Sequence, residues 1–215
     1  PFPMIAGKHK GAGMLLYPAQ VAEVLAPIAE YPEIQFSLKM RLGWENASEC
    51  MVLVELLNTL RLSRIALHAR TGKQQYKGHP DLEAFQGFYE LCQHPLYYNG
   101  DIESLSDIRQ ILIRFPLLKG VFIGRGLLSS PLLAKEFKGN ETFLPEQRMS
   151  IYFAFHEELF SAYSQVLQGE TQLLVKMKTL WEYFLPETDR KLLKRIKKST
   201  RLQQYTESVK AIFTS

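Results

Sequence analysis

The chain has 215 residues, 46% of them hydrophobic and 22% charged, with a net charge of +4. That composition is typical of a globular protein and fits one large domain, or one domain with a small appendage. No apolar run approaches the roughly 18 residues of a transmembrane helix, which argues against a membrane protein or a membrane partner. The two cysteines, Cys50 and Cys92, both fall in apolar helical patterns. We therefore expect buried free thiols and a cytoplasmic protein.

Helical and strand patterns alternate along the first 123 residues. A helical pattern at 17–30 precedes a strand pattern at 34–40, and the order then repeats as helix 48–61, strand 64–68, helix 81–92, strand 95–99, helix 104–114 and strand 120–123. Each repeat is roughly the size of a βαβ unit. This alternation predicts an α/β fold with a parallel sheet and helical crossovers.

The pattern changes after Pro131. Helices are expected at 146–168, 171–184, 187–198 and 203–213, with Gly169 and Pro186 between them. We therefore predict two domains, a strand-containing domain at 1–140 and an all-helical domain at 141–215. Trp181 and Tyr183 are expected in the core of the helical domain.

Seven basic residues and no acidic residue occur from Arg190 to Arg201. Such a cluster is typical of a polyanion-binding surface, although a solvated helix face would give the same pattern.

Polar or cationic residues lie at the carboxyl ends of the four predicted strands. They are Lys39 and Arg41, His68 and Arg70, Asn99 to Asp101, and Gly124 with Arg125. Ligands of parallel α/β folds bind at the carboxyl ends of the strands. Because glycines let the backbone approach closely and arginine supplies a bidentate fork, the last two groups predict a phosphate site. The alternative is that Asn99-Gly100 is only a turn and Gly124 only a packing residue.

Five motifs, in order, resemble those of the tRNA-dihydrouridine synthases. They are LKMRLGW at 38–44, LHART at 67–71, YKG at 76–78, NGDI at 99–102 and IGRG at 123–126. The resemblance is in register over about residues 1–135 and looser over 145–215. It implies the C-terminal half of a TIM (β/α)8 barrel, strands five to eight, followed by an all-α helical bundle domain.

The resemblance also implies that part of the family pattern lies outside this chain. In the family, an Asn-x-Gly-Cys-Pro motif ends the fourth barrel strand, and its cysteine protonates the uracil ring. Pro1-Phe2-Pro3 looks like the residues just after that cysteine. We therefore expect the catalytic cysteine before residue 1 and no catalytic residue in this chain, since neither Cys50 nor Cys92 matches it.

The activity implied by the resemblance is reduction of a uridine in tRNA to 5,6-dihydrouridine, with FMN as cofactor and NADPH as electron donor. No metal is implied. The family pattern assigns the cofactor contacts to Lys39, His68, Asn99, Gly100, Asp101, Gly124 and Arg125. The alternatives are that Lys39 extends to solvent and that His68 is structural.

Substrate contacts are assigned to cations in both predicted domains. Arg41 and Arg70 would contact RNA phosphates or the target base, unless they form ion pairs within the rim of the barrel. In the helical domain the RNA-binding set is Lys176, Lys178, Arg190, Lys194, Arg195, Lys197 and Lys198.

Two other functions fit the same residues. One is an FMN barrel oxidoreductase acting on a small pyrimidine, which would not need a basic helical domain. The other is a non-catalytic RNA-binding fragment. The sequence does not predict the oligomeric state.

Overall fold

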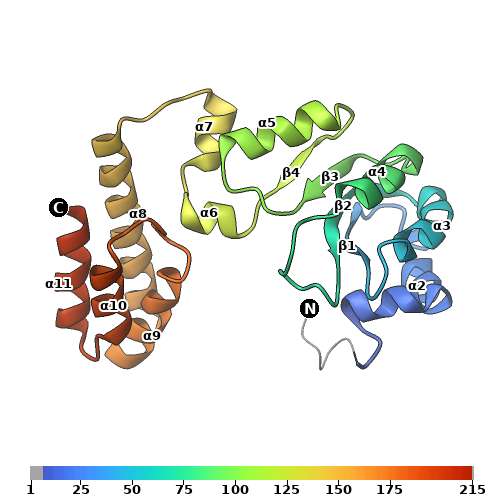
Figure 1. Cartoon of the computed structure of the whole chain (residues 1–215). Coiled ribbons are helices and arrows are strands. Elements are labelled where there is room, and N and C mark those ends of the chain that lie inside the picture. The colour runs from blue at the N-terminus through green and yellow to red at the C-terminus, as the bar shows by residue number, and fades with distance from the viewer. Residues whose placement is uncertain (1–6, 215) are drawn as a thin grey trace. The chain divides into compact units, whose positions relative to one another are not determined.

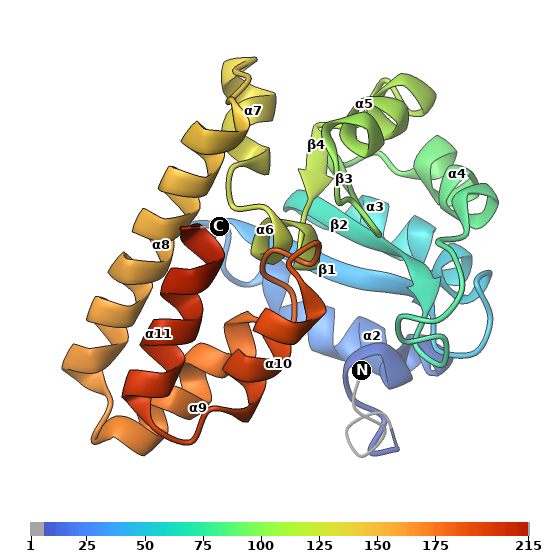
Figure 2. The ribbon, with the colours of Figure 1, turned by 60° about the vertical axis from the view of Figure 1, so that its left-hand side comes forward.

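The computed structural model describes residues 7–214, which form two compact units. The first unit runs to Ile102 and from Ser106 to Ile123, and the second takes Glu103–Leu105 and the chain from Gly124 onward. In Figures 1 and 2 the first unit, coloured blue to green, alternates strands with helices, whereas the second, yellow to red, consists of helices.

A four-stranded parallel sheet organises the first unit, with strand order β1-β2-β3-β4. This confirms the predicted alternation and the parallel sheet. The elements in chain order are η1 (Gly11–Leu16), α2 (Pro18–Leu25), η2 (Ala26–Ala29), β1 (Phe36–Gly43), η3 (Glu49–Leu53), α3 (Val54–Thr59), β2 (Leu62–Thr71), α4 (Leu82–Leu91), β3 (Leu96–Asn99), α5 (Leu105–Arg114) and β4 (Gly120–Phe122).

Strands β1 and β2 continue past their predicted carboxyl ends at residues 40 and 68. Gly43 pairs with Thr71, and the amide of Gly72 donates to the carbonyl of Gly43 at 2.7 Å. Glycine is required at 72, because a Cβ there would lie 2.0 Å from the Trp44 ring. Consequently Arg41 and Arg70 lie within strands and inherit their alternating side-chain directions.

The hydrophobic core of the first unit lies between one face of the sheet and the helices. Ile65, Leu67 and Tyr98 share that face of β2 and β3 and are at most 2% exposed. Phe85 of α4 packs edge-on against Tyr98, with ring centroids 5.0 Å apart. The opposite face of the sheet carries the polar side chains of Lys39, Arg41, His68 and Asn99.

The second unit is built of α6 (Arg125–Ser129), α7 (Leu133–Gly139), α8 (Pro145–Val166), α9 (Glu170–Leu180), α10 (Arg190–Lys198) and α11 (Leu202–Phe213). The C-terminal helical region is therefore confirmed, and α6 and α7 are additional to the predicted helices. Helix α10 begins at Arg190 because the carboxylate of Asp189 accepts hydrogen bonds from the first helical amides.

Residues 124–140 pack with the helical unit, whereas the sequence placed them in the first domain. Leu132 is buried in the helical core, and the hydroxyl groups of Ser130 and Tyr152 are 2.7 Å apart. Glu136 of α7 forms an ion pair with Arg148 of α8. With these contacts, the boundary between the two compact units lies near residue 123, and the domain limits at 140 and 141 stay a prediction.

The core of the helical unit contains Trp181, which is 2% exposed and packs against Phe184. This confirms the expectation for Trp181, but the side chain of Tyr183 is exposed. Between residues 7 and 214, no helix is both long and apolar enough to cross a membrane.

Candidate cofactor and nucleic-acid site

The register of the sheet brings three predicted site residues into one row. Arg41 of β1 pairs with His68 of β2, and His68 pairs with Asn99 of β3. Paired residues of neighbouring parallel strands project to the same face, so these side chains lie side by side at the carboxyl end of the sheet. Lys39 occupies the same face two residues earlier, opposite the small, buried Ala66.

His68 is an uncharged histidine in a cationic environment. It is 7% exposed, and burial lowers its pKa to about 3, with further lowering by Arg41, Lys39 and Arg70 against an opposing effect of Asp101. Its ring therefore offers one donor and one acceptor near neutral pH. Burial and the charge of Arg41 also lower the pKa of Lys39. The row would favour a ligand that brings negative charge.

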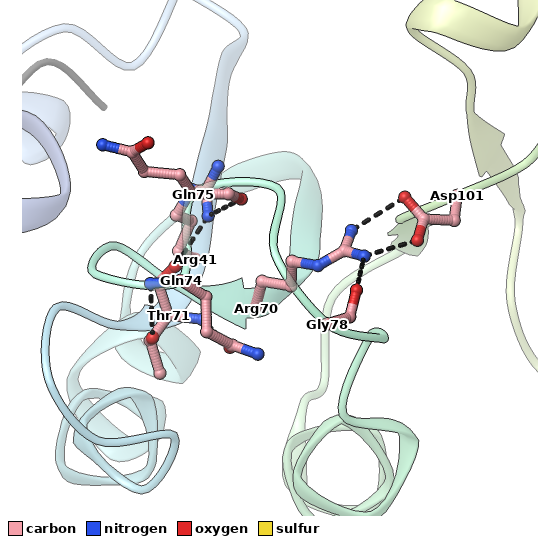
Figure 3. Close-up of polar contacts among 7 residues, drawn as sticks. All are labelled: Arg41, Arg70, Thr71, Gln74, Gln75, Gly78 and Asp101. Atoms are coloured by element: carbon pink, nitrogen blue, oxygen red, sulfur yellow. Dashed lines mark hydrogen bonds and ion pairs between the residues drawn. The ribbon is translucent and has the colours of Figure 1, made fainter.

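Arg41 holds the loop that follows β2. Its Nη1 donates to the backbone carbonyls of Thr71 at 2.7 Å and Gln75 at 3.0 Å (Figure 3). The guanidinium carbon also lies 6.0 Å from the ring centroid of Tyr76. These contacts organise residues 71–76, and the predicted RNA contact of Arg41 stays a prediction.

Arg70 is buried and engaged on two sides. Its Nη1 donates to Oδ1 of Asp101 at 2.8 Å, and its Nη2 pairs with Oδ2 of the same carboxylate. Nη2 also donates to the carbonyl of Gly78 at 2.6 Å, as Figure 3 shows. This is the internal ion pair that was the alternative to an RNA contact, and Arg70 is only 1% exposed. The predicted RNA contact of Arg70 stays a prediction.

The turn after β3 depends on Gly100. The side-chain amide of Asn99 donates to the carbonyl of Phe122 in β4 at 2.7 Å, which fixes the start of the turn. Gly100 has φ +153°, and a Cβ there would lie 2.8 Å from the hydroxyl of Tyr98. Asp101 follows with φ +35°, which is unusual for a residue other than glycine. The side chain of Asn99 and the absence of a side chain at Gly100 therefore determine the conformation of this turn.

Gly124 and Arg125 open the second unit. Gly124 precedes α6, and a Cβ at this position would have no atom within 4 Å. Close packing therefore does not explain Gly124. Arg125 is the first residue of α6 and is half-buried. Joint binding of one phosphate by Asn99–Asp101 and Arg125 stays a prediction.

The cations of α10 lie on the solvent side of that helix. Arg190, Lys194, Arg195, Lys197 and Lys198 are all exposed, while Ile196 is buried in the core. An open hollow of about 410 Å³ between α10 and α11 is lined by Lys191, Lys194, Arg195 and Lys198, together with Ser199, Gln204, Glu207 and Ser208. The exposed cations of α10 thus form a basic surface on that helix, with the acidic Glu207 of α11 in the adjoining hollow.

Lys176 and Lys178 of α9 differ from that set. The Nζ of Lys178 donates to the carbonyl of Ser199 at 2.8 Å and so satisfies the carboxyl end of α10. The Nζ of Lys176 lies 5.3 Å from the ring centroid of Tyr163 and remains exposed. Lys178 therefore has a structural partner, and Lys176 remains accessible to a ligand.

The dihydrouridine synthase (Dus) family matches residues 1–214. The chain belongs to the dihydrouridine synthase family. This confirms the resemblance drawn from the five motifs.

The chain is 35% identical over 135 residues to a probable tRNA-dihydrouridine synthase of Aquifex aeolicus, covering 61% of this chain and 42% of the relative. It is 30% identical over 132 residues to one of Rhizobium leguminosarum bv. phaseoli, covering 61% and 41%. For the tRNA-dihydrouridine(16) synthase of Haemophilus ducreyi, the identity is 29% over 143 residues, covering 65% and 44%. The chain spans less than half the length of these relatives.

The two cysteines of this chain lie in η3 and directly after α4. Cys50 is fully buried in η3, its thiol contacts the carbonyl of Ala47 at 3.4 Å, and burial raises its pKa to about 12. Cys92 follows α4, just before β3 begins, and is half-buried. Both are free thiols, as predicted.

The residues of the row fit the flavin that the dihydrouridine synthase family implies. The set combines a lysine, an uncharged histidine and the Asn99–Asp101 turn at one edge of a parallel sheet. Among the residues described, the buried Nε of Arg70 is a donor without a hydrogen-bond partner. Residues 7–214 contain no group of three or more His, Cys, Asp and Glu residues that could hold a metal ion.

Sequence reasoning missed the pairing of Arg70 with Asp101. Arg70 lies two residues after His68 on the same face of β2, and Asp101 lies in the turn that follows Asn99, the strand partner of His68. The sequence alone does not give the register between β2 and β3, which is needed to bring these two residues together.

Proposed function

We propose that this chain is the part of a tRNA-dihydrouridine synthase that supplies half of the flavin site and the RNA-binding helical domain. Its sheet would form strands five to eight of a TIM barrel. The observation that carries the proposal is the row of Lys39, Arg41, His68 and Asn99 on one face of adjacent parallel strands in a chain of this family. The overall reaction would be reduction of uridine in tRNA to 5,6-dihydrouridine.

Bound FMN would supply the hydride for the C5–C6 double bond of the uridine, with NADPH as the source of electrons. Lys39 would place its ammonium group beside the flavin ring, where positive charge stabilises the negative charge of the reduced flavin. His68, being uncharged, would orient the ring through a hydrogen bond. Backbone amides of Asn99–Asp101 and the Gly124-Arg125 pair would bind the phosphate.

The helical unit favours tRNA over a small pyrimidine as the substrate. Its exposed cations on α10 match the spaced phosphates of a nucleic acid, whereas a free base carries no such charge. The target uridine must leave its stack to reach the sheet, so contacts to the RNA backbone would have to hold the flanking nucleotides.

FMN titration of the purified 215-residue chain, followed by flavin fluorescence, tests the cofactor assignment. Wild type should bind FMN, and Lys39→Ala should bind it about tenfold or more weakly, because a charged hydrogen bond or ion pair is removed. Lys119→Ala, an exposed lysine before β4, is the matched control and should bind like wild type. Equal affinities for Lys39→Ala and wild type would contradict the assignment.

A further inference from the structure

Two arginines of adjacent strands hold the loop between β2 and α4. Arg41 binds the carbonyls of Thr71 and Gln75 near its start, and Arg70 binds the carbonyl of Gly78 near its end (Figure 3). The Oε1 of Gln74 accepts from the amide of Thr71 at 2.9 Å, which tightens the first turn. The loop thus has a defined conformation, set partly from beneath by the sheet.

Arg70 is the point at which this loop meets the turn after β3. The same guanidinium binds the Gly78 carbonyl and both carboxylate oxygens of Asp101. Gly78 and Asp101 both have positive φ values, +63° and +35°. Two segments therefore take conformations that most residues avoid at the places where one buried side chain holds them.

The burial of Arg70, whose partner Asp101 is more exposed, makes it difficult for either segment to move alone. Arg70 is 1% exposed, so opening its contacts would leave a charge in the interior. A lysine could not replace it, because an ammonium group lacks the planar fork that spans a carboxylate and a carbonyl together. Burial, with the hydrogen bond to Asp101, makes the guanidinium a fixed part of the sheet edge.

We propose that Arg70 is a positioning residue that couples the Asn99–Asp101 turn to the loop at 71–78. A ligand that binds the turn then also orders the loop, and ordering the loop favours the ligand by the same factor. This rests on the proposed function, in which the turn contacts FMN. The loop carries Lys73, Tyr76 and Lys77 as exposed side chains, so the coupling links the cofactor to a surface that faces solvent.

Hydrogen–deuterium exchange of the full chain, with and without FMN, tests the coupling. In wild type, FMN should protect residues 71–78 as well as the turn. In Arg70→Met both segments should exchange faster without ligand, FMN should bind about tenfold more weakly, and protection of the loop should disappear. Arg70→Lys should not restore FMN-dependent protection of the loop.

Two further variants control for general unfolding. Asp101→Asn keeps the arginine and removes its anionic partner, and it should also abolish FMN-dependent protection of residues 71–78. Arg114→Met removes an exposed ion pair with Glu83 and should leave exchange in both segments unchanged. Circular dichroism and α4 exchange report whether each variant is folded.

The outcomes separate the coupling from the proposed function. Wild-type chain that fails to bind FMN would contradict the function, and the ligand-free exchange rates of Arg70→Met would then decide whether Arg70 joins the two segments. Full FMN-dependent protection of the loop in folded Arg70→Met and Asp101→Asn would overturn the coupling. Faster exchange of only the loop or only the turn in ligand-free Arg70→Met would overturn the coupling as well.

Discussion

Tyr205 is the centre of a buried polar chain in the helical unit. The indole Nε1 of Trp181 donates to its hydroxyl oxygen at 3.0 Å, and that oxygen lies 2.6 Å from Nε2 of His156. Because the indole only donates, the hydroxyl hydrogen is directed to His156, whose Nδ1–H can donate to Glu157 at 3.1 Å. One consistent set of protons satisfies every member.

Replacing Tyr205 by Phe should destabilise the helical unit by about 1–3 kcal/mol, because it leaves two buried polar atoms without partners. Urea unfolding followed by circular dichroism measures the change. Tyr183→Phe removes a hydroxyl from an exposed ring and is the matched control. A stability loss as large in the control as in Tyr205→Phe would contradict this account of the chain.

The polar residues of the candidate site were predictable to different degrees. His68 and Lys39 were predicted from their positions at strand ends, and the register places them on the same face. The partners of Arg41 and Arg70 were not predicted, because backbone carbonyls of a turn-rich loop carry no residue-specific signal. Their recognition requires the path of residues 71–78 in space.

At the level of secondary structure, α10 combines two functions on opposite sides. Leu192, Leu193 and Ile196 face the helical core, while the cations point to solvent. The carboxylate of Asp189 caps the N-terminus of the helix, and the ammonium group of Lys178 donates to the carbonyl of Ser199 at its C-terminus. The basic surface therefore lies on a helix that has side-chain hydrogen bonds at both ends.

Removing cations from α10 should weaken binding to tRNA and make it less dependent on salt. The variant Lys194→Ala/Lys197→Ala should reduce the slope of log affinity against log salt by roughly 0.7–0.9 for each phosphate that is no longer neutralised. Filter binding at several salt concentrations measures the slope. Lys119→Ala/Lys138→Ala removes the same charge from exposed positions elsewhere and should keep the wild-type slope. Identical slopes for both double variants would argue against the surface.

Most long helices and all four strands were predictable from periodicity, and the short helices were not. Helices α6 and α7 have five and seven residues, too few for an apolar repeat to be recognised. The added residues of β1 and β2 were missed because Gly43 and Gly72 resemble turn residues. In the structure Gly43 is the last residue of β1 and lies against Asn46 and Glu49, whereas Gly72 directly follows β2 and lies against the Trp44 ring.

For the molecule as a whole, the buried histidines His68 and His156 make the free energy of unfolding depend on pH. Burial lowers the pKa of His68 to about 3 and also lowers the pKa of His156. As pH falls through about 6.5, the unfolded chain takes up protons that the folded chain does not. Stability is therefore complete above that pH and decreases below it, and for His68 the loss continues toward pH 3.

The free energy of unfolding should decrease by up to about 1.4 kcal/mol per pH unit for each histidine below about pH 6.5. Trp44 reports the first unit and Trp181 the second, so urea curves of Trp181→Phe and Trp44→Phe measure each unit separately. His68→Asn should reduce the pH dependence seen by Trp44. His79→Asn, at an exposed position, should not change it. Equal stabilities at about pH 7.5 and about pH 5 would disprove the effect.

The linear sequence was sufficient for the parallel α/β pattern, the helical C-terminal region, the family and the edge of the sheet where polar residues gather. Those features follow from local periodicity and from short motifs. Folding determined the partners of the arginines and the unit to which residues 124–140 belong. Arg70 and Asp101 are separated by 31 positions, and Leu132 packs with residues of α9 and α11. Such contacts depend on strand register and helix packing, which bring together residues that no local pattern connects.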